Sequence, residues 1–312
     1  MKFEVDGECM KKVIFMGTPA YADVILKRLI DDSEIEVALV LTQPDRPVGR
    51  KKILTAPPVK MTAQDNGIEV LQPESLKDEE IVKKIEAIGA DLITVAAYGQ
   101  LLPKSVLDIA PCINLHASIL PKYRGASPIQ QAILNGDEYS GVTAMLMDVG
   151  LDTGDMLGFK YIKTSQAPTL DLMMQQLSEL AADLTIDVVK EFENLAPIPQ
   201  LGALSSKCKK IKKQDGLVNF DSALELYRKY CGYFGWPGIF VEGGMKLYGV
   251  ELLDSSSQNS AGEILAIEDE SVVFACKVGS IKVEGLQPAS KAKMSAKAYI
   301  MGKRLKVGDN LL

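Results

Sequence analysis

The feature that most constrains the fold is an alternation of short β-rich runs with helical patterns over the first half of the chain. Apolar and β-branched residues predict buried strands at residues 12–16, 36–41, 91–97 and 112–116. Between these strands, residues 21–30 and 79–88 carry the apolar spacing of helices. The alternation predicts an α/β fold with a Rossmann-like, mostly parallel sheet. A ligand site is then expected beyond the carboxyl ends of the strands.

The second half of the chain has a different pattern. A long apolar periodicity predicts an amphipathic helix over residues 170–192, and the prolines and basic residues that follow indicate a linker. After a further helical pattern at 222–233, short strands are predicted at 239–241, 245–253, 262–266, 271–275 and 280–286. Short strands at this spacing are typical of a small barrel. We therefore expect a first domain over 10–195, a linker over 196–213 and a smaller domain over 214–312.

Composition excludes several classes of protein. The 312 residues are 47% apolar and 24% charged, which fits a globular chain of two domains. No apolar run approaches the ~20 residues that span a bilayer, so no membrane association is expected. The five cysteines include no Cys-x-x-Cys pair, which disfavours disulfides and zinc and favours a reducing cytoplasm. Residues 1–9 are polar, and we expect them to be an extension without function.

One loop carries a concentration of positive charge. The net charge of the chain is −6, which argues against indiscriminate binding of polyanions but allows local basic contacts. From residue 209 onward, 15 Lys and Arg face 12 Asp and Glu. Residues 43–60 interrupt the α/β pattern after the second strand, with five basic residues against Asp45 alone: Arg46, Arg50, Lys51, Lys52 and Lys60. Such a run is usually a solvated loop, but its place at a strand end favours a contact with a phosphate backbone.

The chain contains a single histidine, so any catalysis by imidazole must use His116. Asn114 lies two positions earlier on the same predicted strand, so both side chains project from one face at its carboxyl end. A carboxamide and an imidazole can both donate hydrogen bonds to a developing oxyanion. A lone histidine at a strand end is more often structural, and the neighbouring Asn114 shifts that balance modestly. One histidine without a cysteine pair disfavours a metal site.

A glycine-rich turn dense in carboxylates spans residues 147–155 and includes Asp148, Asp152 and Asp155. Such a turn can bring one aspartate back toward a neighbouring strand end. The aspartates can equally do no more than close the turn, and the spacing alone does not separate the two interpretations.

The sequence lacks the motifs that are typical of dinucleotide-binding proteins, hydrolases and phosphotransferases. The turn after the first strand, at residues 15–19, lacks Gly-x-Gly-x-x-Gly, which disfavours a dinucleotide-dependent oxidoreductase. The sequence also has no Gly-x-Ser-x-Gly and no phosphate-binding loop of the Gly-x-x-x-x-Gly-Lys-Ser/Thr type.

Taken in order, the motifs resemble those of the folate-dependent formyltransferases. The resemblance spans most of residues 11–160 and reaches into the second domain. Each piece alone is weak, whereas the ordered set is highly specific. The pieces are Phe15-x-Gly17-Thr18-Pro19, Gln43-Pro44-Asp45-Arg46-Pro47-x-Gly49-Arg50, Ala97-Tyr98-Gly99, Asn114-x-His116, Ser118-Ile119-Leu120-Pro121, Arg124-Gly125-Ala126, Asp148-x-Gly150-x-Asp152-Thr153-Gly154-Asp155 and Trp236-Pro237-Gly238.

The resemblance implies a Rossmann-like catalytic domain joined to a C-terminal OB-like β-barrel. It implies 10-formyltetrahydrofolate as co-substrate, no metal, and the amino group of methionine on initiator tRNA as acceptor. The family's catalytic residues fall on Asn114, His116 and Asp152. Its folate-binding residues fall on Ser118, Ile119, Leu120 and Pro121, and the nearby Tyr98 and Gly99 are expected to line the same slot. Its tRNA-binding loop falls on Arg46, Arg50, Lys51 and Lys52, with Arg50 as the key contact.

Two positions depart from the family pattern. Ala117 stands where the family usually has Gly, and Ile119 stands where it usually has Leu. Both changes are small and apolar, so we expect altered packing against the folate and no loss of chemistry. Within the same chemistry, the alternatives are transfer to an amino sugar or a glycinamide nucleotide, or hydrolysis of the folate. From a different class, the alternative is a noncatalytic tRNA-binding protein, which would leave Asn114, His116 and Asp152 unexplained. We expect the protein to act as a monomer.

Overall fold

The computed structural model describes residues 10–49, 51–164 and 168–311. The chain forms two compact units, each described by itself below. The first contains the described residues up to Pro128, Tyr139–Lys163 and Met174–Cys208, and the second contains Ile129–Glu138, Thr164–Met173 and Lys209 onward. Within these described ranges, no helix is both long enough and apolar enough to cross a membrane.

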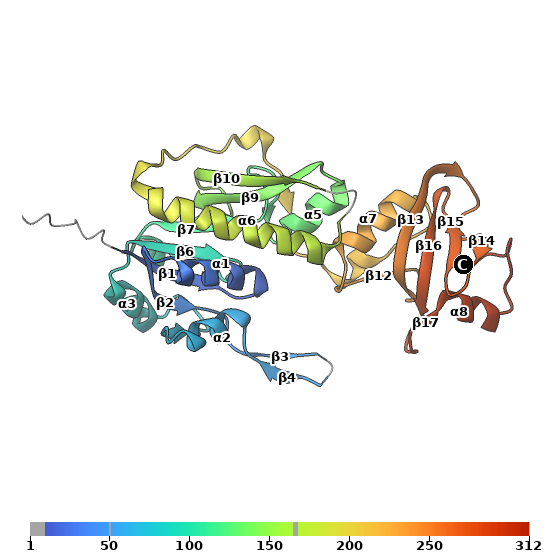
Figure 1. The fold of residues 1–312 in the computed structure, drawn as a ribbon, viewed down its shortest axis with the longest axis horizontal. Helices are drawn as coiled ribbons and strands as arrows, with labels where there is room; N and C mark the ends of the chain where they lie inside the picture. The colour runs from blue at the N-terminus through green and yellow to red at the C-terminus, as the bar shows by residue number, and fades with distance from the viewer. Residues whose placement is uncertain (1–9, 50, 165–167, 312) are drawn as a thin grey trace, which may run out of the picture. The chain divides into compact units, whose positions relative to one another are not determined.

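The first unit is built on a seven-stranded sheet with strand order β10-β9-β7-β6-β1-β2-β5 (Figure 1). Its neighbouring pairs β1–β2, β1–β6, β2–β5 and β6–β7 are parallel, while β9 is antiparallel to both β7 and β10. The four predicted strands and the mostly parallel sheet are thus confirmed. The strands are β1 (Lys11–Gly17), β2 (Ile35–Leu41), β5 (Val70–Leu71), β6 (Leu92–Ala96), β7 (Cys112–His116), β9 (Tyr139–Leu146) and β10 (Met156–Lys163).

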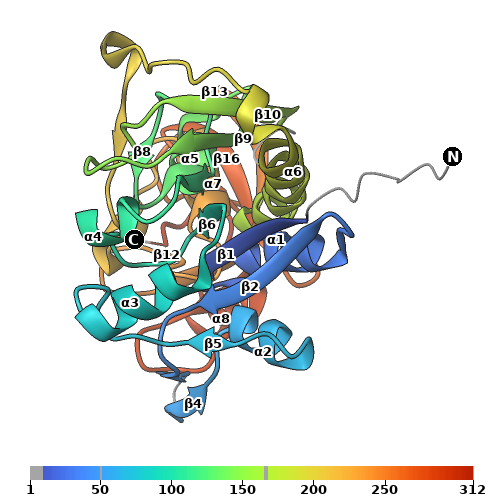
Figure 2. The ribbon, with the colours of Figure 1, turned by 90° about the vertical axis from the view of Figure 1, so that its left-hand side faces the viewer.

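Helices cover both faces of this sheet. Helices α1 (Ala20–Asp31) and α6 (Leu170–Glu191) lie on one face, and α3 (Glu79–Ile88) lies on the other (Figure 2). Arg28 of α1 forms ion pairs with Glu179 and Asp183 of α6. Along each strand, successive buried side chains face one helical layer and then the other. Both faces of the sheet therefore carry apolar side chains, and the strands are continuous apolar runs in the sequence. The remaining helices of the first half are α2 (Pro58–Asp65), α4 (Lys104–Leu107) and α5 (Pro128–Asn135).

The basic loop predicted at residues 43–60 contains regular structure. Strands β3 (Arg46–Val48) and β4 (Ile53–Thr55) pair as an antiparallel hairpin, and α2 begins at Pro58. Gly49 and Lys52 both have left-handed backbone conformations, which allow the chain to reverse between the strands. The sequence pattern did not predict the hairpin because each strand is three residues long and exposed, so neither shows the alternation of a buried strand.

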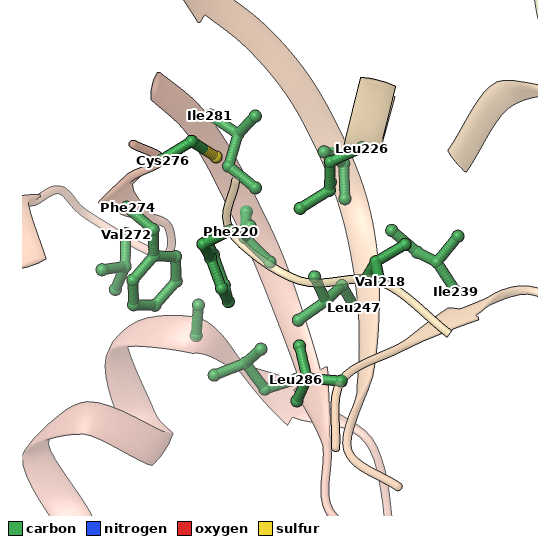
Figure 3. Packing of buried hydrophobic residues seen from close by; sticks show 14 of the residues in the cluster. Val218, Phe220, Leu226, Ile239, Leu247, Val272, Phe274, Cys276, Ile281 and Leu286 are labelled. Carbon is green, nitrogen blue, oxygen red and sulfur yellow. The ribbon is translucent and has the colours of Figure 1, made fainter. Parts of the chain in front are cut away.

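The second unit contains the C-terminal antiparallel sheet, with order β12-β13-β16-β15-β14 and β17 paired to β16. Phe220 and Phe274 meet edge to face in its core, with ring centroids 6.0 Å apart (Figure 3). The described strands form an open path, and no pairing closes them into a ring. The elements are α7 (Ala223–Gly232), β12 (Ile239–Phe240), β13 (Lys246–Gln258), β14 (Ile264–Ile267), β15 (Val272–Ala275), β16 (Val278–Gln287), β17 (Met294–Ser295) and α8 (Ala296–Gly302).

Much of the segment predicted as a linker makes ordered contacts within the first unit. After a short 3₁₀ turn at Phe192–Asn194, Ile198 pairs with Met156 at the start of β10. A second 3₁₀ turn at Gly202–Leu204 leads into β11 (Lys207–Cys208), which runs parallel to β8 (Arg124–Gly125). The segment 198–208 is therefore part of the same unit as the large sheet.

Candidate active site

Strand β7 ends with the two side chains that the sequence singled out. Asn114 is partly buried, and the His116 side chain is only 6% exposed. The Nδ2 of Asn114 donates to Oδ1 of Asp152 over 3.4 Å, and Nδ1 of His116 lies 3.7 Å from Oδ2 of the same carboxylate. The Nε2 of His116 lies 2.9 Å from the carbonyl oxygen of Tyr123, so this nitrogen carries the hydrogen and donates it. The structure thus brings the predicted carboxamide, imidazole and carboxylate together.

Asp152 is held in a backbone conformation that costs free energy. Its φ of 54° lies in the left-handed region, which costs a residue other than glycine about 1–2 kcal/mol. Contacts fix the side chain in return, because the backbone N–H of Gly125 donates to Oδ2 over 2.8 Å. The carboxylate is 12% exposed, so it is largely withdrawn from water and its hydrogen bonds gain strength.

In the carboxylate-rich turn, one aspartate closes the turn and another reaches a neighbouring strand end, so each interpretation of the sequence holds for a different residue. Asp148 closes the turn by accepting from the Gly150 N–H and from the Thr153 hydroxyl, each over 2.8 Å. Asp152 reaches the end of β7 instead. Gly154 permits this path, since a Cβ there would lie 1.7 Å from the carbonyl oxygen of Leu146. Asp148 thus stabilises the turn from which the Asp152 side chain extends toward β7.

A backbone segment that the sequence did not single out as part of the site completes the cluster. Tyr123 supplies the carbonyl that binds His116, and Gly125 supplies the N–H that binds Asp152. Ser206 holds this segment, because its hydroxyl accepts from Tyr123 N over 2.9 Å and its carbonyl accepts from Arg124 N over 2.9 Å. These contacts use main-chain atoms, which every residue has. The side chains of the segment therefore gave no indication of its role, apart from the Arg-Gly-Ala motif.

Comparison with known proteins assigns the chain to a family. Residues 10–189 match the family described as "Formyl transferase", and residues 210–304 match "Formyl transferase, C-terminal domain". The chain belongs to the formyl transferase family. The predicted resemblance is confirmed.

The relatives of this formyl transferase are similar over nearly their whole length. A methionyl-tRNA formyltransferase of Sulfurovum sp. is 53% identical over 301 residues, covering 96% of this chain and 99% of the relative. One of Sulfurimonas denitrificans is 53% identical over 300 residues, with the same coverage. Among solved structures, the sugar 3N-formyl transferase WlaRD matches with a TM-score of 0.65 and 16% identity, covering 91% of this chain and 99% of that one. The last likeness concerns the fold alone.

Half of the residues predicted to bind folate in this formyl transferase have inward-facing side chains. Ser118, Leu120 and Tyr98 are buried, and the Ser118 hydroxyl donates to the Lys122 carbonyl over 2.6 Å. Ile119 and Pro121 are partly exposed, and Gly99 is exposed in a left-handed conformation. The side chains of Ile119 and Pro121 are thus accessible to a folate, whereas the buried side chains stabilise the loops in which the predicted folate-binding residues lie.

Tyr98 provides a test of this division. Its hydroxyl is buried without a hydrogen-bond partner among the described residues, and burial raises the pKa of the phenol to about 12. Tyr98→Phe removes that unpaired group, so it is expected to raise the free energy of unfolding by about 1 kcal/mol and leave the KM for the formyl donor unchanged. Denaturant unfolding and steady-state kinetics check this, with the exposed Tyr161→Phe as control. A raised KM would show that the hydroxyl binds the donor.

The predicted tRNA-binding residues of this formyl transferase lie on the exposed β3–β4 hairpin. Arg46, Lys51 and Lys52 are exposed, whereas Arg50 lies outside the described residues. Three apolar side chains on the hairpin are also exposed: Val48, Ile53 and Leu54. Lys60 forms an ion pair with Asp45 at the base of the hairpin, over 2.9 Å, while Arg46, Lys51 and Lys52 present their positive charge to solvent.

No group of three or more His, Cys, Asp or Glu is placed to hold a metal ion in the described part of this formyl transferase. The four cysteines that the structure describes are buried and free: Cys112, Cys208, Cys231 and Cys276. Burial raises the pKa of the Cys208 thiol, which keeps this group protonated beside the Tyr123–Gly125 segment.

Proposed function

We propose that the protein transfers the formyl group of 10-formyltetrahydrofolate to the amino group of methionyl initiator tRNA. The observation that carries the proposal is the convergence of Asn114 and His116 on Asp152 in a formyl transferase chain. Relatives that are 53% identical over nearly the full chain bear the name methionyl-tRNA formyltransferase, which supports the choice of acceptor. The reaction supports translation initiation, and its tRNA substrate places the protein in the cytoplasm.

Asn114 stabilises the charge that develops during transfer. Attack by a neutral amine on the formyl carbon forms a C–N bond and moves the carbonyl electron pair onto oxygen. One hydrogen of the Asn114 amide is directed at Asp152, and the other has no acceptor among the residues that the structure describes, so it is available to the oxyanion. A donor of this kind is worth roughly 3 kcal/mol, or about a hundredfold in rate. We assign oxyanion binding first to Asn114, because both ring nitrogens of His116 face other groups.

His116 and Asp152 move the proton. Nε2 of His116 donates to the Tyr123 carbonyl, and Nδ1 lies 3.7 Å from the Asp152 carboxylate, so a proton taken up by either group can be shared between Nδ1 and the carboxylate. The ammonium formed by attack loses its proton to this pair, and the pair returns a proton to the folate nitrogen as the C–N bond to the donor breaks. The oxyanion then collapses to the formamide, so protons and electron pairs balance without a metal. Gly125 N–H keeps the carboxylate in place throughout.

The donor is placed by the loops that follow β6 and β7. Residues 97–102 contain left-handed turns at Ala97 and Gly99 and expose the Leu101 side chain by 79%. A pterin ring binds through backbone hydrogen bonds and apolar contacts, and these turns offer both. Ile119 and Pro121 supply further apolar surface after β7. Ala117 and Ile119 keep this surface apolar despite departing from the family pattern.

The acceptor tRNA is bound by the basic hairpin, with Arg50 as the key contact, and by the C-terminal domain. We place that domain in the OB class, because its open antiparallel sheet of six strands resembles the partly open barrels that bind oligonucleotides. The segment directly before this domain adds positive charge, because four lysines lie at 209–213 and bring the count from residue 209 onward to 15 Lys and Arg against 12 Asp and Glu. We propose domain limits of 10–195 and 214–312, joined by a connection over 196–213 whose residues 198–208 pack on the first unit, and a monomer as the active form.

Binding of tRNA through phosphate contacts predicts a strong dependence on salt. We expect the KM for methionyl-tRNA to rise at least about tenfold between 50 and 200 mM salt, because each neutralised phosphate releases counterions. The KM for the formyl donor should change little over the same range. Steady-state kinetics at four salt concentrations measures both. A KM for tRNA that is indifferent to salt would contradict the assignment of the hairpin.

The acceptor itself is tested by direct competition. The protein is incubated with 10-formyltetrahydrofolate and methionyl initiator tRNA, a nucleotide-linked amino sugar, or glycinamide ribonucleotide. Formylmethionyl-tRNA is the expected product. Formylation of a small amine alone would transfer the assignment to another acceptor, and release of formate with no acceptor would indicate a hydrolase.

A further inference from the structure

One polar side chain in an otherwise exposed stretch lies against the catalytic turn. Residues 196–205 are exposed except for Gln200, which is partly buried. Its Nε2 donates to the carbonyl oxygen of Gly154 over 2.7 Å and to that of Asp152 over 3.1 Å. Both hydrogens of the amide nitrogen are therefore directed at the turn that presents the Asp152 carboxylate.

The other end of the same amide binds a different part of the site. Oε1 of Gln200 accepts from Nη2 of Arg124 over 2.7 Å and from Nε over 3.0 Å. Arg124 can only donate and the two carbonyls can only accept, so this arrangement fixes the orientation of the amide. Arg124 lies between Tyr123, whose carbonyl binds His116, and Gly125, whose N–H binds Asp152. Gln200 thus joins the two backbone segments on which the imidazole and the carboxylate depend.

We propose that Gln200 is a positioning residue for formyl transfer, acting through the Asp152 turn and the Arg124 segment. The left-handed backbone of Asp152 needs contacts that hold it, and Gln200 binds the carbonyl of that residue. Without Gln200, the Asp152 carboxylate moves away from Asn114 and His116 while the folate-binding loops stay in place. The inference rests on the proposed function, since it concerns the rate of the same reaction.

The test compares two substitutions at Gln200 with a matched control. Gln200→Met keeps the length of the side chain and removes its hydrogen bonds to Arg124, Asp152 and Gly154, together with the weak contact of Nε2 with the Met145 sulfur. Gln200→Glu keeps an acceptor for Arg124 but cannot donate to the two carbonyls. Gln176→Met makes the same replacement at an exposed position of α6. For each protein, kcat, both KM values, the binding of 5-formyltetrahydrofolate by calorimetry and the thermal unfolding midpoint are measured.

We expect kcat to fall about 30- to 100-fold in both Gln200 variants, because a shift of about 1 Å in a catalytic group costs this much. The KM and the dissociation constant for the folate should stay within about twofold of the wild type, and Gln176→Met should match the wild type. The Arg124→Met, Gln200→Met double variant should be no slower than the slower single variant, because both residues act through one contact.

A normal kcat in Gln200→Met, or a loss confined to KM, would overturn the proposal. Should Gln200→Met fail to fold, Gln200→Glu carries the same test, because it retains the bond to Arg124. An active wild type with equally active variants contradicts this inference alone. A wild type that formylates no methionyl-tRNA contradicts the proposed function as well.

Discussion

Replacement of Asp152 by asparagine is expected to lower kcat by about a thousandfold, the scale of a lost proton-transfer group. The substitution keeps the shape of the side chain but replaces a charged acceptor with an amide. The new NH₂ group either opposes the Gly125 N–H, which now donates over 2.8 Å, or faces the Asn114 amide at 3.4 Å. The asparagine can neither take up the ammonium proton nor accept hydrogen bonds from both the Gly125 N–H and the Asn114 amide.

The matched control for this prediction is Asp148→Asn in the same turn. An asparagine there still accepts from the Gly150 N–H and the Thr153 hydroxyl, so kcat should stay within about threefold of the wild type. Rapid-quench measurement of a single turnover, with saturating folate and methionyl-tRNA, isolates the chemical step. Equal rates for Asp152→Asn and the wild type would remove Asp152 from the mechanism.

Gly125→Ala is expected to lower the free energy of unfolding by about 3 kcal/mol and kcat by about a hundredfold. Gly125 has a φ of 124°, and a Cβ at this position would lie 2.2 Å from the carbonyl oxygen of Cys208. Relief of the clash separates β8 from β11. The separation displaces both the N–H that holds Asp152 and the adjacent Tyr123 carbonyl that holds His116.

Gly202→Ala is the control, because no atom lies within 4 Å of the added Cβ and Gly202 belongs to the 3₁₀ turn that leads into β11. Its unfolding free energy should stay within about 0.5 kcal/mol of the wild type. Denaturant unfolding and steady-state kinetics measure both variants. A Gly125→Ala protein with wild-type stability and kcat would mean that β11 does not support the site.

The sequence was sufficient to predict the parts of the fold that have a strong local pattern. Strand β7 is buried and carries Asn114 and His116 two residues apart, so their common face followed from the period of a strand. Helix α6 followed in the same way from its long apolar periodicity. The position of Asp152 beside them was one of two open interpretations, because the path of a glycine-rich turn depends on contacts such as that of Gly154 with Leu146.

The supporting residues could not be predicted in this way, for two physical reasons. Strands β8 and β11 are two residues long and join Arg124 to Lys207 across a large separation in sequence, so neither shows a period. Tyr123 and Gly125 act through main-chain atoms, which every residue has. Gln200 lay in a segment rich in proline and lysine that is typical of a linker. Only its contacts with both Arg124 and Gly154 mark it as part of the site.

The most direct test of the central claim is a crystal structure of the protein with bound 5-formyltetrahydrofolate. Formyl transfer by the cluster at the end of β7 requires the reacting group of the folate to reach Asn114 and Asp152. We predict that the pterin lies along residues 97–102 and that N10 of the folate lies within about 4 Å of the Asn114 amide or the Asp152 carboxylate. A folate bound with N10 far from both side chains would contradict the account.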